Sequence, residues 1–116
     1  MTQKIVGIVG PCAAGKSTLI AKLKERGYPC KHIAQEHSYV PDMWKRIGNP
    51  DVLIYLDVSF EVSMQRRKLN WTKDEFNQQV YRLRHALKSA DLYLQTDDLS
   101  PQEVFQRVLR FLQNDS

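Results

Sequence analysis

Near its start the chain carries the segment Gly10-Pro11-Cys12-Ala13-Ala14-Gly15-Lys16-Ser17, followed by Thr18. This segment fits the pattern G-x-x-x-x-G-K-[ST] without a gap. The apolar residues 4–9 before it predict a short buried strand, and residues 16–26 after it predict a helix that stops at Gly27. A strand, this loop and a helix in that order are the setting that a phosphate-binding loop requires.

The residue types in this loop suit the binding of an anion. Gly10 and Gly15 can adopt backbone angles that are closed to other residues, and they let the main chain approach a ligand closely. Successive N–H groups then converge on a phosphate, with the positive end of the following helix behind them. Lys16 supplies a cation for the outer phosphates, and the Ser17 hydroxyl is placed to ligate Mg²⁺. We therefore expect residues 10–18 to bind ATP or another nucleoside triphosphate with Mg²⁺; the alternative is a glycine-rich turn without a ligand.

Length and composition exclude several classes of protein. With 116 residues the chain makes a single domain, 1–116, and 42% hydrophobic with 26% charged residues is typical of a soluble globular protein. The start of the chain does not resemble a signal peptide, and no apolar run is long enough to span a membrane. Two cysteines, Cys12 and Cys30, make no disulfide framework, which favours a reducing, cytoplasmic setting. The net charge of +4 suits nucleotide phosphates, and its spread over several predicted helices disfavours nucleic acid.

Strand and helix signals alternate along the rest of the chain. The predicted strands are 30–34, 52–56 and 92–94, and the predicted helices are 41–47, 60–69, one starting from a capping box at 72–75 and ending near 89, and one starting at 101. The run 52–56 is continuously apolar, as in a strand that is covered on both faces. This alternation predicts an α/β three-layer sandwich with a mostly parallel sheet of about four strands. The phosphate loop should then lie at the carboxyl edge of the sheet.

Three blocks of the chain resemble the P-loop nucleoside and nucleotide kinase-like group of the P-loop NTPase superfamily. They are residues 10–18, 50–58 and 90–104, and only the first is sharply specific. The resemblance implies a phosphotransferase whose second block precedes a lid and whose third block forms the final strand and the turn beside adenine. Only residues 27–49 occupy the place where such kinases carry a longer acceptor-binding region. The chain therefore looks like a reduced member of the group.

Two carboxylates are candidates to assist Ser17 in holding the metal. Asp57 follows the apolar strand 52–56, but in the kinase-like group the equivalent position opens the lid helix, away from the metal. Glu36 follows the strand 30–34 and would reach the phosphates if that strand lies beside the first one. We favour Glu36, as a residue that assists either the metal or the acceptor; a helix cap or a surface carboxylate is the alternative for both residues. His37 could orient an acceptor hydroxyl or act as a base, although a solvated histidine in a polar loop is the favoured interpretation.

Basic residues fall where the resemblance places the lid. Arg66 and Arg67 are candidates to close over the transferred phosphate, because a guanidinium suits recognition of several oxygens at once. Arg82 or Arg84 on the next helix could lie against the adenine or the phosphates. A solvated basic face is the alternative for each of these residues. Asp97 and Asp98 fall at the adenine-side turn, where turn formation explains them equally well.

Four other residues carry weaker signals. Trp71 could stack on a base at the lid tip, although core packing is the favoured role for both Trp71 and Trp44. Apolar surface around Trp44 and Tyr39 would allow a homodimer. Cys12 could be redox-sensitive, although its position needs only a small residue.

The function best supported by the sequence is transfer of a γ-phosphoryl group from ATP to a small hydroxyl acceptor. Lys16, Glu36, Arg66 and Arg67 are its expected catalytic residues, and Ser17 and Glu36 its metal ligands. The alternative is a non-catalytic or slowly hydrolysing nucleotide-dependent module, because the acceptor region is short. A pocket lined by Glu36, His37 and Asp42 would favour the kinase.

Overall fold

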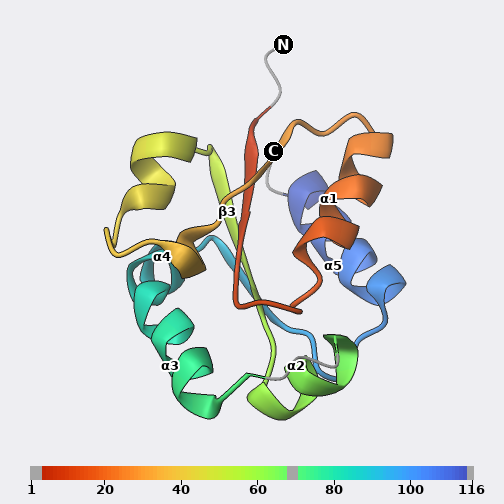
Figure 1. Cartoon of the computed structure of the whole chain (residues 1–116). Helices are drawn as coiled ribbons and strands as arrows, with labels where there is room; N and C mark the ends of the chain where they lie inside the picture. Colours follow the sequence, from red (N-terminus) through yellow and green to blue (C-terminus); the bar gives the residue numbers. More distant parts are fainter. Residues whose placement is uncertain (1–3, 68–70, 115–116) are drawn as a thin grey trace.

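The computed structural model describes residues 4–67 and 71–114. At its centre lies a parallel sheet with the strand order β2-β1-β3-β4 (Figure 1). The strands are β1 (Val6–Val9), β2 (Cys30–His32), β3 (Val52–Asp57) and β4 (Leu92–Gln95). The predicted α/β architecture with a small parallel sheet is therefore confirmed.

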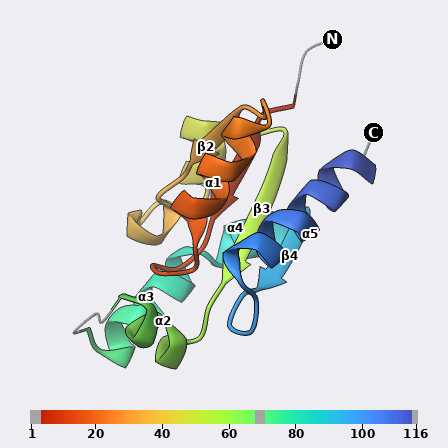
Figure 2. The same cartoon turned by 90° about the vertical axis from the view of Figure 1, so that its right-hand side faces the viewer.

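Helices cover both faces of this sheet. Their bounds are α1 (Lys16–Glu25), α2 (Phe60–Arg67), α3 (Lys73–Arg82), α4 (Arg84–Ser89) and α5 (Pro101–Asn114), with a 3₁₀ turn η1 (Gln35–His37) and a π-helical turn η2 (Trp44–Gly48). Helices α1 and α5 lie side by side on one face, as Figure 2 shows, and α4 packs on the other. Helix α2 lies at the carboxyl ends of the strands, near the loop after β1 (Figure 1).

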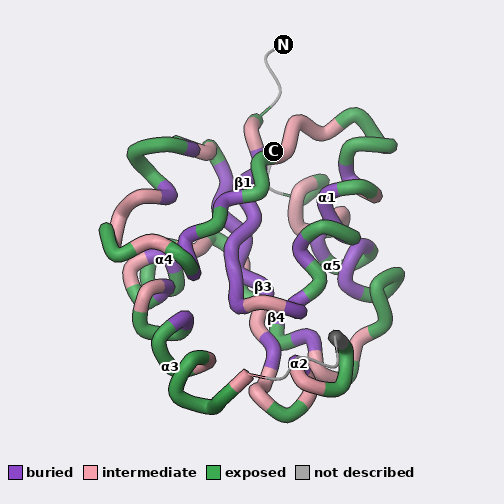
Figure 3. Tube along the Cα trace, viewed as in Figure 1, coloured by how far each residue is buried: buried purple, intermediate pink, exposed green. Residues whose placement is uncertain are grey.

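The apolar run of β3 is explained, as predicted, by burial of both faces of the strand. Alternate side chains, such as Ile54 and Leu56, pack into the cluster beneath α1 and α5. The side chains between them, Leu53 and Tyr55, pack with Trp44 and Leu83 on the opposite face. Because successive side chains of a strand point to opposite faces, a strand covered on both sides needs apolar residues throughout. The buried trace of the inner strands is visible in Figure 3.

Several predicted boundaries were wrong. Strand 4–9 begins only at Val6, strand 30–34 ends at His32, and residues 68 and 69 of the predicted helix 60–69 lie outside the described residues. The predicted helix 41–47 is instead the turn η2, in which Asn49 N donates to Trp44 O at 3.2 Å. The wider turn accompanies the burial of Trp44, which is only 8% exposed. Core packing of Trp44 is thus confirmed, whereas Tyr39 is exposed.

The predicted helix between the capping box and residue 89 is interrupted. The capping box of Thr72 and Glu75 is present, and Ser89 ends the second part, but Leu83 separates α3 from α4. Leu83 is fully buried in the cluster under α4. The break lets α3 pack on η1 while α4 packs on β3. Tertiary packing has overridden a continuous helical pattern here.

Among residues 4–67 and 71–114, no helix combines the length and the apolar character that crossing a membrane would require.

Candidate functional site

The loop between β1 and α1 has the backbone geometry of the predicted anion site. A Cβ atom at Gly10 would collide with the carbonyl oxygen of Leu56, so this position requires glycine. Gly15, with φ of 98°, is the N-cap of α1, and Ala13 has φ of 69°. No described side chain caps α1, and no acidic residue lies in its first turn. The first N–H groups of the helix are therefore not claimed by a side chain, while Ser17 and Thr18 are exposed.

Lys16 folds back under this loop and meets Glu36. Its Nζ atom donates to Glu36 Oε2 at 2.5 Å and to the carbonyl oxygen of Gly10. Both side chains are buried, 6% and 4% exposed. The condition that the sequence left open is met, because β2 pairs with β1 and brings the segment after it to the phosphate loop. The expected lysine and carboxylate are thus brought together.

Glu36 is held in place by its neighbours in η1. Gln35, which is fully buried, accepts from Trp44 N at 2.8 Å and donates to Val40 O and Arg82 O. Arg82 in turn donates to Glu36 O at 3.3 Å. Buried polar groups need such partners, and these tie η1 to η2 and α3. The sequence pointed to Arg82 but gave no signal for Gln35, because a glutamine in a polar segment normally faces solvent.

Asp57, the other candidate carboxylate, is engaged elsewhere. Its Oδ2 accepts from the Tyr93 hydroxyl at 2.6 Å and its Oδ1 from Val58 N at 2.9 Å. Burial, with this hydrogen bond and the negative charge of Asp57, raises the pKa of Tyr93 to about 12. The structure therefore separates the two carboxylates: Glu36 meets the loop lysine, and Asp57 links the ends of β3 and β4.

A glutamine that the sequence did not identify lies against the loop. Gln79 of α3 accepts from Cys12 N at 3.0 Å and donates to Cys12 Sγ at 3.2 Å. It is 6% exposed although its neighbours on α3 face solvent. A polar side chain in the apolar stripe of a helix was the available signal, since residues 76, 79, 80 and 83 share one face. The backbone N–H of Cys12 in the loop is thus bonded to the Gln79 side chain of α3.

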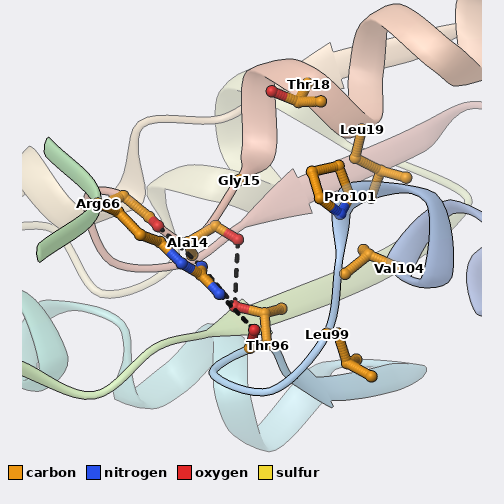
Figure 4. Close-up of a pocket in the computed structure, with 10 residues that line it drawn as sticks. Ala14, Gly15, Thr18, Leu19, Arg66, Thr96, Leu99, Pro101 and Val104 are labelled. Atoms are coloured by element: carbon orange, nitrogen blue, oxygen red, sulfur yellow. Dashed lines mark hydrogen bonds between the residues drawn. The ribbon is translucent and has the colours of Figure 1, made fainter. Parts of the chain in front are cut away.

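An open pocket lies on the other side of the loop. It has a volume of about 460 Å³ and is lined by the loop, the start of α1, Arg66 and the segment from β4 into α5. Figure 4 shows the apolar side chains of Leu99, Pro101 and Val104 opposite Thr18 and Gly15. A cleft with apolar walls and a few polar groups is typical of small-molecule sites. The third predicted block, 90–104, contributes this wall.

Arg66 crosses one end of that pocket. It donates to Ala13 O at 3.1 Å, to Thr96 Oγ1 at 2.9 Å and to Thr96 O (Figure 4).

Asp97, a candidate at the turn after β4, lies near Arg66. Burial acts to raise the pKa of Asp97, but hydrogen bonds from Ser59 and Gln95 and the charge of Arg66 lower this pKa overall. The Asp97 carboxylate therefore helps to form the turn by accepting from Ser59 N.

The other lid and aromatic candidates have different positions. The side chain of Arg67 and all of Lys68 lie outside the described residues. Arg84 stacks on Tyr81, with 3.8 Å between its Cζ and the ring centroid, and donates to Tyr81 O. Trp71 packs edge-on against Phe76, at 5.8 Å between ring centroids.

The three residues expected at the acceptor side make separate contacts and do not line the groove next to them. Glu36 is buried against Lys16, and Asp42 pairs with Arg46 at 2.9 Å. His37 is exposed and lies 3.8 Å from Glu36 Oε2. Tyr39 is 85% exposed and lies under the Arg82 guanidinium. The nearby groove, of about 580 Å³, is lined by Tyr39 and Arg82 with residues of α3, and not by Glu36, His37 or Asp42.

No protein-family model matches this chain, and no curated protein matches it at a significant level. The interpretation of the site therefore rests on its motif and its geometry.

Proposed function

We propose that the chain binds a nucleoside triphosphate, ATP or a related one, as its Mg²⁺ complex. The observation that carries this proposal is Lys16, folded beneath an uncapped helix N-terminus at the carboxyl edge of a parallel sheet, next to an open apolar pocket. Ligands of open α/β sheets bind at this edge. Residues 10–18 would surround the phosphates, and the pocket beside Arg66 would take the base. The proposal makes the chain a small P-loop protein related to the nucleoside and nucleotide kinases.

The residues present fit a magnesium ion. Ser17 exposes its hydroxyl at the start of α1. Glu36 has one buried oxygen, Oε1, with no hydrogen-bond partner in the described part of the chain, which leaves a carboxylate oxygen available for a cation. Mg²⁺ prefers such oxygen ligands and keeps several waters. Ser17 and Glu36 would hold the ion, whose charge offsets that of the phosphates.

The proposed activity is transfer of the γ-phosphoryl group to a small hydroxyl acceptor. Phosphoryl transfer depends on positioning and on neutralising charge. Lys16 would leave Gly10 O and Glu36 to bind the outer phosphates, and Glu36 would then be free for the metal or the acceptor. Arg66 or Arg67 would add a guanidinium above the phosphates.

One observation favours the alternative, a slowly hydrolysing module. Hydrolysis needs a polar side chain that orients water at the phosphate end of the loop. Gln79 is such a side chain, bonded to both Cys12 N and Cys12 Sγ. A screen of hydroxyl acceptors separates the two activities, since the kinase consumes ATP faster when its acceptor is present and the hydrolase does not.

The test of nucleotide binding is calorimetric titration of ATP·Mg²⁺ into Lys16→Ala. We expect affinity to fall by about 100-fold, or about 2.7 kcal/mol, because charge-assisted contacts to phosphate are lost. Lys24→Ala, which changes an exposed lysine of the same helix, is the matched control and should bind as the wild type does.

Lys16→Ala also leaves Glu36 buried without its cation, so folding must be checked. The double variant Lys16→Met/Glu36→Gln removes both charges and tests the same loss of affinity. Unchanged ATP affinity in a folded Lys16 variant would overturn the proposal.

A further inference from the structure

Three potential metal ligands meet at the edge of the phosphate loop. They are the thiol of Cys12, the carboxylate of Glu36 and the imidazole of His37, each offering one ligand atom within 4.8 Å of the others. Cys12 Sγ lies 4.0 Å from His37 Nε2, which lies 3.8 Å from Glu36 Oε2. Cys12 comes from the loop after β1 and the other two from η1 after β2, so the parallel pairing of these strands brings them together.

A second observation at the same place points to a cation. Glu36 Oε1 is buried and has no hydrogen-bond partner among residues 4–67 and 71–114, although Oε2 of the same carboxylate binds Lys16. A buried carboxylate oxygen without a partner costs free energy. A second cation beside Glu36 would remove that cost, and Lys16 would keep its bond to Gly10 O.

The surroundings of the thiol suit a metal ligand. Gln79 Nε2 donates to Cys12 Sγ at 3.2 Å, so the sulfur already serves as an acceptor of a hydrogen bond. Outer contacts of this kind orient the ligands of metal sites. Gln79 is itself held by Cys12 N, which fixes the side chain relative to the loop.

We propose that Cys12, Glu36 and His37 bind a thiophilic divalent metal ion of the Zn²⁺ class. Bond lengths for tetrahedral zinc would place sulfur and nitrogen about 3.6 Å apart, and nitrogen and oxygen about 3.4 Å apart. The observed 4.0 Å and 3.8 Å are somewhat longer, and the Cys12 and Glu36 ligand atoms lie within 4.8 Å of each other. A turn of the His37 side chain, which is 60% exposed, would shorten the first two distances, and a turn of the Cys12 side chain would bring the sulfur toward Glu36. Binding releases the thiol proton to solvent and leaves a fourth position for water.

This site shares Glu36 with the proposed Mg²⁺ site, so the two ions would compete for that carboxylate, but its other ligands differ. A thiolate and an imidazole select softer ions, whereas Mg²⁺ selects oxygen. The metal proposal also does not rest on nucleotide binding, so it is tested with nucleotide-free protein.

The test is titration with Co²⁺, which reports its ligands spectroscopically, followed by displacement with Zn²⁺. We expect the wild type to develop a thiolate-to-cobalt charge-transfer band that Zn²⁺ abolishes. Cys12→Ser should lose the band and bind Zn²⁺ at least about tenfold more weakly, or about 1.4 kcal/mol. Cys30→Ser is the matched control, since Cys30 is the other thiol, half-buried and bonded to Tyr28 O.

His37→Ala tests the second ligand with little risk to folding, because its side chain is largely exposed. It should keep the charge-transfer band but weaken Zn²⁺ binding by a similar factor. Absence of the band in the wild type, or equal loss in Cys12→Ser and Cys30→Ser, would overturn the proposal. Failure of the Lys16→Ala nucleotide test would leave these results unchanged, so the two proposals fail separately.

Discussion

The two sides of the phosphate loop differ in how their polar groups are satisfied. On the side of α5 the loop borders an open pocket of about 460 Å³, with an apolar wall. On the side of η1 and α3 the groups that would bind phosphate are already bonded within the chain, Lys16 to Glu36 and Cys12 N to Gln79. A ligand can enter the pocket beside α5 without breaking these hydrogen bonds. On the side of η1 and α3, a ligand must replace internal hydrogen bonds with its own.

This difference has an energetic consequence. Exchanging one hydrogen bond for another changes the free energy little, whereas filling an apolar pocket gains the free energy of burial. We therefore expect burial of the base in the pocket to favour nucleotide binding. Binding of the phosphates should require the hydrogen bonds around Glu36 to rearrange.

The largest effect should follow from substitution of Glu36, on the side of η1 and α3. In Glu36→Gln the buried Lys16 ammonium loses its counter-charge, and removing one partner of a buried pair costs about 3–5 kcal/mol. Urea denaturation should show this loss of stability. Asp57→Asn is the control, because its half-exposed carboxylate holds only Tyr93 and a neighbouring amide. Recovery of stability in Lys16→Met/Glu36→Gln would support the pair as the cause; an equal loss in Asp57→Asn and Glu36→Gln would contradict it.

A smaller effect is expected from substitution of Arg66, at the pocket beside α5. Arg66→Ala removes the bonds to Ala13 and Thr96 at the end of the pocket. We expect ATP affinity to fall by about tenfold, or about 1.4 kcal/mol, while inorganic triphosphate, which has no base, loses less. Both ligands are compared by calorimetry in the variant and in Arg110→Ala, an exposed arginine of α5. Equal losses for the two ligands would mean that Arg66 acts on the phosphates and not on the base.

The smallest effect should come from Gln79. Gln79→Ala frees Cys12 N, so phosphate no longer has to displace an internal acceptor, and ATP should bind a few-fold more tightly, by about 0.5–1 kcal/mol. Gln78→Ala, the exposed neighbour, is the control. Weaker binding by Gln79→Ala, measured in the same titration, would instead indicate that Gln79 contacts the ligand directly.

The fold was largely predictable because its signals are local. The apolar run of β3, the two capping boxes and the glycine loop each follow from side-chain periodicity or backbone freedom within a few residues. The break at Leu83 and the turn at Trp44 were not predictable in this way. Both depend on which buried side chain reaches a core formed by distant strands.

Local sequence was sufficient for the phosphate loop and for a sheet covered on two faces, because backbone freedom and side-chain alternation act over a few residues. The choice of Glu36 over Asp57 required the tertiary contacts, since β2 and β3 both pair with β1, but only Glu36 meets Lys16 while Asp57 accepts from Tyr93 of β4. The position of Gln79 likewise came only from the packing of α3 against η1. Such contacts join residues far apart in the chain, and no local pattern encodes them.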